Sequence, residues 1–370
     1  MSASPAVSAL ERLAPRFQGA LLGALLGDVV GSRYEGRGFV SPVALAKDAR
    51  NFHMRRNDDF QYTDDTAMLR SVAQSLIDNG RFDAQDMSQR FAKEYQKEPL
   101  RGYGAGVVTV FEKFQQRAYA GDDVFTPAAE QFEGRGSFGN GGAMRVAPVA
   151  LAYPATADVK HIARLSARIT HANSLGYNGT ILQALAVHFA IAEDNICALT
   201  FVDKLIQEML EVEESSNDKA SAKSATPYCN RLEKIKEFLN LKDVPREDVV
   251  QHLGNGVQAL ESVPTAVYAF LRCLQPEPDI PDELGGVART LLYAISLGGD
   301  TDTVASMAGA IAGAYHGDGG LPASWLQLSE GVQEARTQAR QLLGQYQRNL
   351  RSSSSSVDHK PSQDCNAEQK

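Results

Sequence analysis

Two short acidic motifs have the composition of a divalent-cation site. They read TDDT at residues 63–66 and GGDTDT at residues 298–303. Carboxylate and hydroxyl oxygens are the ligands that Mg²⁺ prefers in proteins. If the four carboxylates met in one cleft without cations, they would repel one another and some would take up protons. Two Mg²⁺ ions would neutralise them. The aspartates and the flanking threonines that could add hydroxyl ligands are Asp64, Asp65, Asp300, Asp302, Thr63 and Thr303.

Helix capping is the alternative interpretation of these motifs. Each precedes a segment with helical apolar spacing, at residues 67–77 and 304–315. Thr and Asp are favoured at helix N-caps and first turns. A single motif would favour capping, whereas two motifs with paired aspartates and flanking threonines favour a metal site. Because the sequence shows no competing His or Cys cluster, zinc is not expected.

A Gly-rich loop supplies candidate anion contacts. Residues 134–142 read GRGSFGNGG. Glycine lets backbone N–H groups converge on phosphate oxygens, and a helix beginning at Ala143 would add its positive end. The loop matches neither the GxxxxGK[ST] phosphate loop nor a dinucleotide-binding fingerprint after a strand. Phe132 and Phe138 flank it and could stack a nucleobase. A flexible turn and core packing are the alternative interpretations.

Two further side chains become candidates only beside these motifs. Glu35 follows the first glycine-patterned segment, and alone it would be a solvated loop residue. Next to a metal pair it could act as an acid, a base or a labile ligand. His171 lies where a predicted helix ends, and a lone His there usually makes helix-terminal hydrogen bonds. A second Gly-rich segment, RGYGAG at 101–106, also interrupts the helical pattern.

Helical apolar spacing covers nearly the whole chain, and strict alternation over six or more residues is almost absent. We therefore expect an all-α, compact bundle in which residues 17–348 form one domain. Residues 1–16 are predicted to be flexible, 211–226 a mobile surface loop, and 349–370 a disordered tail. The predicted helices are 17–31, 66–77, 87–95, 107–114, 159–169, 175–192, 201–210, 257–271, 287–295, 303–315 and 325–346.

Small residues four apart recur in GALLGALLGD at 19–28 and AGAIAGAY at 308–315. This spacing lets helix backbones approach closely and predicts tight core packing. These regions also contain the longest apolar stretches, 20–30 and 304–315. Both are shorter than the roughly 20 residues of a membrane span, so we expect no membrane association.

The charge balance narrows the classes of function. The chain has 45 acidic and 37 basic residues, a net charge of -8, which argues against a broad nucleic-acid-binding surface. Its four cysteines are far apart in sequence, which fits a reducing compartment better than secretion. The N-terminus has no secretory signal, while Arg12 and Arg16 leave a mitochondrial address open.

Together these motifs resemble those of the ADP-ribosyl-acceptor hydrolase (ADP-ribosylglycohydrolase) family, from about Phe17 to about Trp325. The similarity rests on YTDDTAM (62–68), GNGGAMR (139–145), THANSLGYNG (170–179) and SLGGDTDT (296–303). RGYGAGVVTVF, GSFGNGGAMR and LGNGVQALESVPTAVY are most similar to the vertebrate branch that cleaves poly(ADP-ribose) and serine-linked ADP-ribose.

The resemblance implies an all-α orthogonal bundle around a di-magnesium cleft. It implies a monomeric enzyme of the nucleus and cytoplasm, with the mitochondrial matrix left open. The enzyme would remove ADP-ribose from modified proteins and from poly(ADP-ribose), and O-acetyl-ADP-ribose is a further candidate substrate. It would reverse ADP-ribosylation in the DNA damage response. No sequence-specific contact with nucleic acid is expected.

The resemblance also implies roles for individual residues. Glu35 matches the glutamate implicated in catalysis, and Phe138 replaces the usual adenine-stacking Tyr. Residues 211–226 match the branch poorly, and the tail has no counterpart. The metal ligands would be Glu35, Thr63, Asp64, Asp65, Asp300, Asp302 and Thr303. The substrate-binding residues would be Asp64, Gly102, Gly104, Phe132, Arg135, Gly136, Ser137, Phe138, Gly139, Asn140, Gly141, His171 and Val257.

The implied reaction is hydrolysis of the anomeric C1″–O bond of ADP-ribose through an oxocarbenium-like transition state. Three alternatives stay open at this level. The chain could be an arginine-ADP-ribose hydrolase, a reader that binds ADP-ribose without cleaving it, or a structural protein like the lens crystallins related to this fold.

Overall fold

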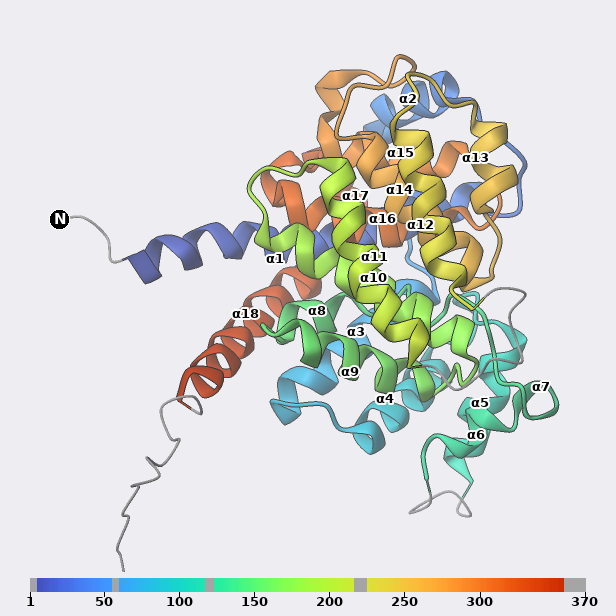
Figure 1. Cartoon of the computed structure of the whole chain (residues 1–370), viewed down its shortest axis with the longest axis vertical. Coiled ribbons are helices and arrows are strands. Elements are labelled where there is room, and N and C mark those ends of the chain that lie inside the picture. The colour runs from blue at the N-terminus through green and yellow to red at the C-terminus, as the bar shows by residue number, and fades with distance from the viewer. Residues whose placement is uncertain (1–4, 55–59, 117–122, 216–224, 356–370) are drawn as a thin grey trace, which may run out of the picture.

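The computed structural model describes residues 5–54, 60–116, 123–215 and 225–355. These residues form helices and no β-strand, with isolated bridges joining Gly139 to Gln258 and Glu277 to Ile280 (Figure 1). The all-α prediction is confirmed. The α-helices are α1 (Pro5–Gly31), α2 (Pro42–Arg50), α3 (Asp64–Asn79), α4 (Ala84–Lys97), α5 (Ala105–Gln115), α6 (Thr126–Ala129), α7 (Gln131–Gly134), α8 (Ala147–Ala152), α9 (Thr156–Arg168), α10 (Ser174–Ala192), α11 (Ala198–Glu214), α12 (Pro227–Leu239), α13 (Arg246–Leu253), α14 (Ala259–Arg272), α15 (Gly285–Ser296), α16 (Thr301–His316), α17 (Ala323–Leu328) and α18 (Val332–Ser355).

The two glycine-patterned segments pack against each other as α1 and α16. A Cβ added at Gly23 would lie 2.1 Å from the carbonyl oxygen of Gly309, and one at Gly27 would lie 2.2 Å from that of Ala305. No side chain fits at these distances, so glycine is required for the two backbones to touch. The tight packing predicted from the sequence is confirmed, and the two segments are partners in one contact.

This antiparallel contact sets where the acidic motifs lie. The contact runs from Gly19 beside Gly313 to Gly31 beside Asp302, so the C-terminal end of α1 meets the N-terminal end of α16. Short 3₁₀ helix η1 (Ser32–Tyr34) then leads from α1 to Glu35. Close helix packing therefore places Glu35 beside the GGDTDT motif.

Backbone hydrogen bonds hold the loop after Glu35 against the same motif. The N–H of Gly36 donates to the carbonyl of Gly299 at 3.0 Å, and the N–H of Gly299 donates to the carbonyl of Arg37 at 2.9 Å. Gly298 and Gly299 have φ values of 72° and 76°, the left-handed region that favours glycine. The glycines of GGDTDT thus shape the turn that locks the Glu35 loop in place.

Helix α10 lies in the core of the bundle. It is long and apolar enough to cross a membrane by length and composition alone, which the sequence analysis overlooked. In the structure, 78% of that window is buried against other helices, as expected for the core helix of a globular protein. The described residues contain one such helix.

Several predicted boundaries differ from the structure. Helix α1 begins at Pro5, so residues 5–16, expected to be flexible, are helical, and Arg12 and Arg16 form ion pairs with Asp194. The predicted helix 325–346 is two helices, α17 and α18, because Gly331 adopts a φ of 82°. Helix α18 continues to Ser355, seven residues into the expected tail.

The loop boundaries also changed. The helix expected at Ala143 begins at Ala147, so its positive end is farther from the Gly-rich loop. Val257 precedes α14 and is not within it. Part of the predicted 211–226 loop is helical, since α11 ends at Glu214, and residues 216–224 and 356–370 lie outside the described residues. Helices α2, α6, α7, α12 and α13 were not predicted; α2, α6, α7 and α13 are short, whereas α12, with 13 residues, was missed despite its buried apolar face.

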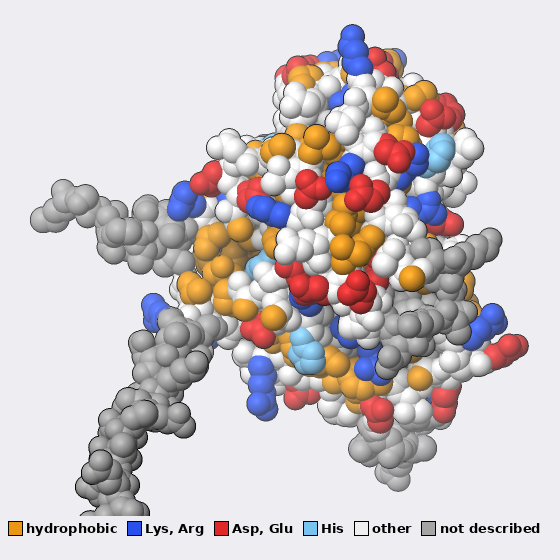
Figure 2. Space-filling view, viewed as in Figure 1, with side chains coloured by type: hydrophobic (Ala, Val, Ile, Leu, Met, Phe, Trp, Pro, Cys, Tyr) orange, Lys and Arg blue, Asp and Glu red, His pale blue; other side chains and the backbone are white. Residues whose placement is uncertain are grey.

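The visible surface carries interspersed charges of both signs. Figure 2 shows Lys and Arg side chains alternating with Asp and Glu over the described part of this face, and no continuous basic field. Three cysteines are free, with Cys197 exposed and Cys229 and Cys273 buried, while Cys365 lies outside the described residues.

Candidate active site

The two acidic motifs line a single cavity of about 270 Å³. They enter it from the N-termini of α3 and α16, with Glu35 and the two Gly-rich segments completing the wall. Most of the residues predicted from the sequence line this cavity: Glu35, Thr63, Asp64, Asp65, Gly102, Gly104, Phe132, Ser137, Gly139, Asn140, Gly141, His171, Val257, Asp300, Asp302 and Thr303.

Capping and site formation are combined at α3. Thr63 is its N-cap, and its hydroxyl accepts a hydrogen bond from the N–H of Asp65 at 3.3 Å. Asp64 and Asp65 form the first turn, where the helix dipole favours negative charge. The capping interpretation is therefore right for this backbone, while the carboxylates of the same residues face the cavity.

The second motif also lies at a helix N-terminus, that of α16, but its N-cap side chain makes no capping hydrogen bond. Asp300 is the N-cap residue and lies against Asn255, whose carbonyl accepts its N–H at 2.9 Å. Asp302 and Thr303 follow in the first turn and are almost completely buried. The hydroxyl of Thr303 donates to Oδ2 of Asp65 at 3.2 Å. This hydrogen bond joins the two motifs directly, across 238 residues of sequence.

A residue that the sequence analysis missed holds the first motif in place. Asp28 of α1 is fully buried, and its carboxylate accepts from the N–H of Thr63 at 3.0 Å and from the N–H of Thr66 at 3.0 Å. It also accepts from the hydroxyl of Thr66 at 2.6 Å. Asp28 therefore satisfies three donors at the start of α3. The sequence could have identified Asp28, because it is the single charged residue in the apolar stretch 17–31.

Burial and mutual repulsion disfavour the charged form of three carboxyl groups in the cavity wall, those of Asp64, Asp65 and Asp302. Burial and the charge of Asp28 raise the pKa of Asp64 to about 7. Burial, with Asp300 and Glu35 nearby, raises the pKa of Asp302 to about 9. Burial also raises the pKa of Asp65 well above its usual range. A positive charge in the cavity would reverse these shifts.

The residues present fit a divalent metal. One carboxylate oxygen from each of Glu35, Asp300 and Asp302 lies within 4.8 Å of the others, so this acidic cluster can hold a metal ion. Oδ1 of Asp65 is buried and has no hydrogen-bond partner among the described residues. A buried carboxylate oxygen without a donor is costly unless a cation satisfies it. The donor set is entirely oxygen, which suits Mg²⁺ rather than zinc.

Glu35 lies at the exposed side of the cluster. It follows η1 and remains exposed to solvent. Partial burial, and secondarily the charge of Asp300, raises its pKa above the usual value for a glutamate. This carboxyl group therefore keeps its proton to a higher pH than an ordinary glutamate does.

Asn140 connects the Gly-rich loop to the acidic cluster. Its side-chain amide donates to Oδ2 of Asp300 at 2.6 Å and to the hydroxyl of Ser262 at 3.1 Å. Its backbone N–H donates to the carbonyl of Val257 at 3.0 Å. The loop that would hold an anion is thus fixed to the same frame as the carboxylates.

Phe132 lines the cavity and has a strained backbone. Phe132 and Glu133 have φ values of 52° and 60°, which non-glycine residues rarely adopt. Such conformations cost roughly 1–3 kcal/mol each and often occur where a side chain must be presented to a ligand. The Phe132 ring is 50% exposed, so an aromatic face is available to a ligand.

Three of the predicted substrate contacts do not line this cavity. The Arg135 side chain is 75% exposed and its nearest charged partner is Glu133, at 3.8 Å. Gly136 packs against Asn173, with space for no Cβ, and Phe138 is 43% exposed at the surface. Their proposed substrate contacts stay predictions. The cavity also contains residues that the sequence analysis missed: Met68, Tyr103, Gly106, Val107, Met144 and Arg145.

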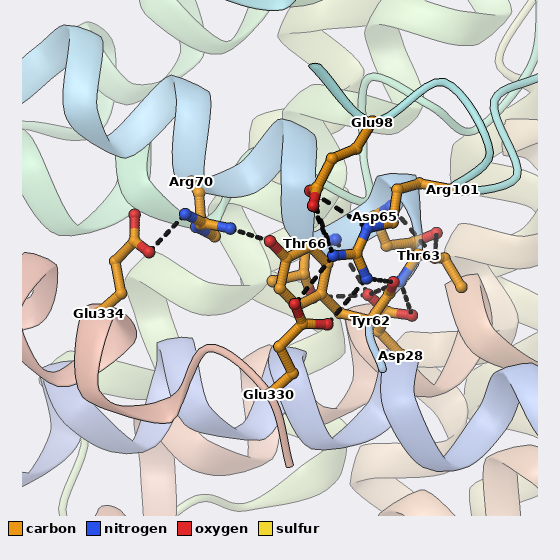
Figure 3. Close-up of polar contacts among 10 residues, drawn as sticks. All are labelled: Asp28, Tyr62, Thr63, Asp65, Thr66, Arg70, Glu98, Arg101, Glu330 and Glu334. Atoms are coloured by element: carbon orange, nitrogen blue, oxygen red, sulfur yellow. Dashed lines mark hydrogen bonds and ion pairs between the residues drawn. The ribbon is translucent and has the colours of Figure 1, made fainter. Parts of the chain in front are cut away.

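A cluster of charged residues contacts the TDDT motif and the residue before it (Figure 3). Arg101 donates to the carbonyl of Tyr62 at 2.8 Å, and its guanidinium lies 4.1 Å from the centre of the Tyr62 ring. It also pairs with Glu98 at 3.1 Å and Glu330 at 2.8 Å. Its own carbonyl accepts the N–H of Asp64 at 2.7 Å. Arg101 therefore ties the TDDT motif to the segment before α18.

Comparison with known proteins shows the family to which the chain belongs. The sequence model of the family described as ADP-ribosylglycohydrolase matches residues 9–351. The chain is 50% identical to human ADP-ribosylhydrolase ARH3 over 338 residues, 88% of this chain and 92% of that protein. It is 49% identical to the Gallus gallus ADP-ribosylhydrolase ARH3 over 355 residues, 92% of this chain and 96% of that protein.

A solved structure supports the fold. It is described as an ADP-ribosylglycohydrolase-related protein complex, and it matches with a TM-score of 0.64 at 24% identity over 91% of this chain and 99% of that chain. The fold and the relatives together define a glycosyl hydrolase. The chain belongs to the ADP-ribosylglycohydrolase family, and its relatives support hydrolysis of ADP-ribosyl groups as its activity.

Proposed function

We propose that this enzyme uses two Mg²⁺ ions to hydrolyse the O-glycosidic bond that links ADP-ribose to serine in proteins and to the next ribose in poly(ADP-ribose). The observation that carries the proposal is the meeting of both acidic motifs in one cavity, with the Asp65 Oδ1 atom unpartnered among the described residues. The identity to ADP-ribosylhydrolase ARH3 from several vertebrates supports the same activity. O-acetyl-ADP-ribose is a further candidate substrate.

The proposed ligands of the ions are Glu35, Thr63, Asp64, Asp65, Asp300, Asp302 and Thr303, all in the wall of the cavity. When bound, such ions polarise substrate and water oxygens and orient them for hydrolysis. The hydrogen bonds made by Thr303 and Asp28 hold the two acidic motifs in position. Asp65 and Asp302 are buried, which keeps bulk water from their carboxylates, whereas Glu35 faces solvent.

The remaining groups would position the substrate and move a proton. Glu35 would exchange a proton at its carboxylate with the attacking water or with the leaving oxygen, or would move aside to admit substrate. The backbone N–H groups of residues 139–141 and the His171 ring would hold the diphosphate. The exposed rings of Phe132 and Phe138 would stack on the adenine. Binding energy from these remote groups would position the anomeric carbon.

The test compares substrates and metal in one assay. We expect release of ADP-ribose from a serine-ADP-ribosylated peptide with Mg²⁺, little release after chelation with EDTA, and little from an arginine-linked peptide. Faster release from the arginine-linked peptide would select the arginine-specific alternative. Tight binding of ADP-ribose without turnover would select the non-catalytic reader.

A matched pair of variants separates the site from helix capping. Asp302→Asn removes one carboxyl group of the cluster, whereas Asp83→Asn alters the N-cap of α4, which does not line the cavity. We expect the first to lower turnover by at least about 100-fold and to weaken Mg²⁺ binding by calorimetry. In the absence of metal and near neutral pH it should be about as stable as the parent, because the raised pKa of Asp302, about 9, already keeps its carboxyl neutral, and the amide replaces a neutral group of similar shape. The second should retain activity. Wild-type turnover in Asp302→Asn would refute the metal proposal.

A further inference from the structure

A buried chain of three side chains ends at His171. Arg145 is 1% exposed, Thr170 is 1% exposed and His171 is 7% exposed. Nη2 of Arg145 donates to the hydroxyl oxygen of Thr170 at 2.6 Å and to the carbonyl of Ser166 at 3.2 Å. The same Thr170 oxygen lies 2.8 Å from Nδ1 of His171.

The direction of these hydrogen bonds follows from what each group can do. A guanidinium only donates, so Thr170 must accept from Arg145. The hydroxyl hydrogen of Thr170 is then free to point elsewhere. Among the described residues, Nδ1 of His171 is the one acceptor within hydrogen-bond distance of this hydroxyl. Thr170 therefore donates to Nδ1, and a neutral ring must carry its proton on Nε2.

Nε2 faces the Gly-rich loop. A Cβ added at Gly141 would lie 3.1 Å from Nε2, and one at Gly139 would lie 3.5 Å from it. Both glycines line the cavity with His171. The ring edge that carries the proton is thus the edge presented to a ligand in the loop.

We propose that Arg145 and Thr170 are positioning residues that hold His171 as the neutral tautomer with its proton on Nε2, so that the ring donates a hydrogen bond to a diphosphate oxygen. The identification of the ligand as a diphosphate rests on the proposed function. The other tautomer would present a lone pair to the anion and would repel it. In this arrangement Arg145 acts on the ligand through Thr170 and His171.

The surroundings also keep the ring neutral. Burial, and secondarily the charge of Arg145, lowers the pKa of His171 to about 3. The imidazole is therefore a neutral donor across the physiological range, and its orientation depends on the Thr170 hydroxyl rather than on a charge. Arg145 is the single charged residue between Arg135 and Asp158. This isolated charge was the signal by which the sequence could have identified it.

Nitrogen NMR of ¹⁵N-histidine-labelled protein tests the tautomer directly. The protonated and unprotonated ring nitrogens of a neutral imidazole resonate far apart, and comparison with His171→Ala assigns the signals among the seven histidines. We expect the Nε2–H tautomer in the Mg²⁺-loaded protein without any ligand. A proton on Nδ1 would overturn the proposal, whatever the variants do. This result is independent of the proposed function.

Variants of Thr170 test its effect on the ligand. Thr170→Val keeps the shape and removes the hydroxyl, so the Nδ1 resonance should shift and the Kd for ADP-ribose should rise about 3- to 10-fold, as for one lost hydrogen bond. Thr170→Ser restores the hydroxyl and should stay within about 2-fold of the parent. Thr290→Val is the control, since within the described part of the chain the buried hydroxyl of Thr290 hydrogen-bonds the Gly286 carbonyl alone and Thr290 does not line the cavity.

The outcomes separate the two proposals. An unchanged Nδ1 resonance and an unchanged Kd in Thr170→Val would overturn the role of Thr170. An equal loss of affinity in Thr290→Val would assign the effect to general destabilisation. Failure of the parent enzyme to bind ADP-ribose would count against the proposed function, while the tautomer would still be decided by its spectrum.

Discussion

Replacing Gly27 by alanine tests whether the contact between α1 and α16 sets the geometry of the active site. The new Cβ would lie 2.2 Å from the oxygen and 2.3 Å from the carbonyl carbon of Ala305. Ordinary carbon contacts are about 3.5–4.0 Å, so the helices must separate by roughly 1 Å or more. Overpacking costs about 1–3 kcal/mol, and rigid backbone atoms place this case at the upper end.

The separation should reach the active site. Gly31, one turn beyond Gly27, packs on the backbone of Thr301 and Asp302. A displacement of about 1 Å at reacting groups can cost about 100-fold in rate. Gly19→Ala makes a similar clash, with its Cβ 2.2 Å from the oxygen of Gly313. It lies about 12 Å farther along α1, so it should lose similar stability and much less activity.

The assay is urea denaturation together with turnover of a serine-ADP-ribosylated peptide. Gly344→Ala in α18 is the matched control, because its Cβ would meet only the end of the flexible Arg348 side chain, at 3.7 Å. It should gain about 0.5–1 kcal/mol through reduced backbone entropy in the unfolded chain. If Gly27→Ala matched the parent in stability and turnover, the close contact would not position the site.

Three further predictions follow from the surroundings of the carboxylates. Asp28→Ala leaves two buried donors and one partly buried donor without an acceptor, at about 1–3 kcal/mol for each buried one. The urea midpoint should therefore fall sharply, and Mg²⁺ affinity measured by calorimetry should weaken. A variant with the stability and Mg²⁺ affinity of the parent would show that Asp28 is dispensable. Arg101→Lys keeps the charge but cannot form the same paired contacts with Glu330. We expect kcat/KM to fall about 10-fold with little change in the urea midpoint. Unchanged kinetics would show that Arg101 does not support the TDDT motif. In the metal-free protein, burial raises the pKa of Asp64 to about 7 and that of Asp302 to about 9, so the folded state holds more protons than the unfolded state above about pH 4. Its stability should therefore fall as pH rises from about 5 to 9, and Mg²⁺ should reverse the trend; a urea midpoint that is flat with pH in the metal-free protein would contradict the assigned cause.

Local sequence patterns determined the chemistry and the class of fold. The aspartates and threonines of TDDT and GGDTDT show their role through residue type alone, since oxygen ligands and helix caps need the same side chains. Helical spacing identified most helices because each depends on neighbours three or four residues away. The glycine spacing in α1 and α16 likewise indicated close packing, because only glycine leaves room for a neighbouring backbone.

Tertiary structure alone decided which of these residues meet. The Thr303–Asp65 hydrogen bond, the support of α3 by Asp28, and the chain from Arg145 to His171 join segments that are far apart in sequence. Such pairings depend on how whole helices pack, and no local spacing encodes them. For the same reason Arg135, Gly136 and Phe138, which share the Gly-rich loop with cavity residues, lie outside the cavity wall. The residue types thus come from the sequence, whereas the packing of α1 against α16 brings them together as one site.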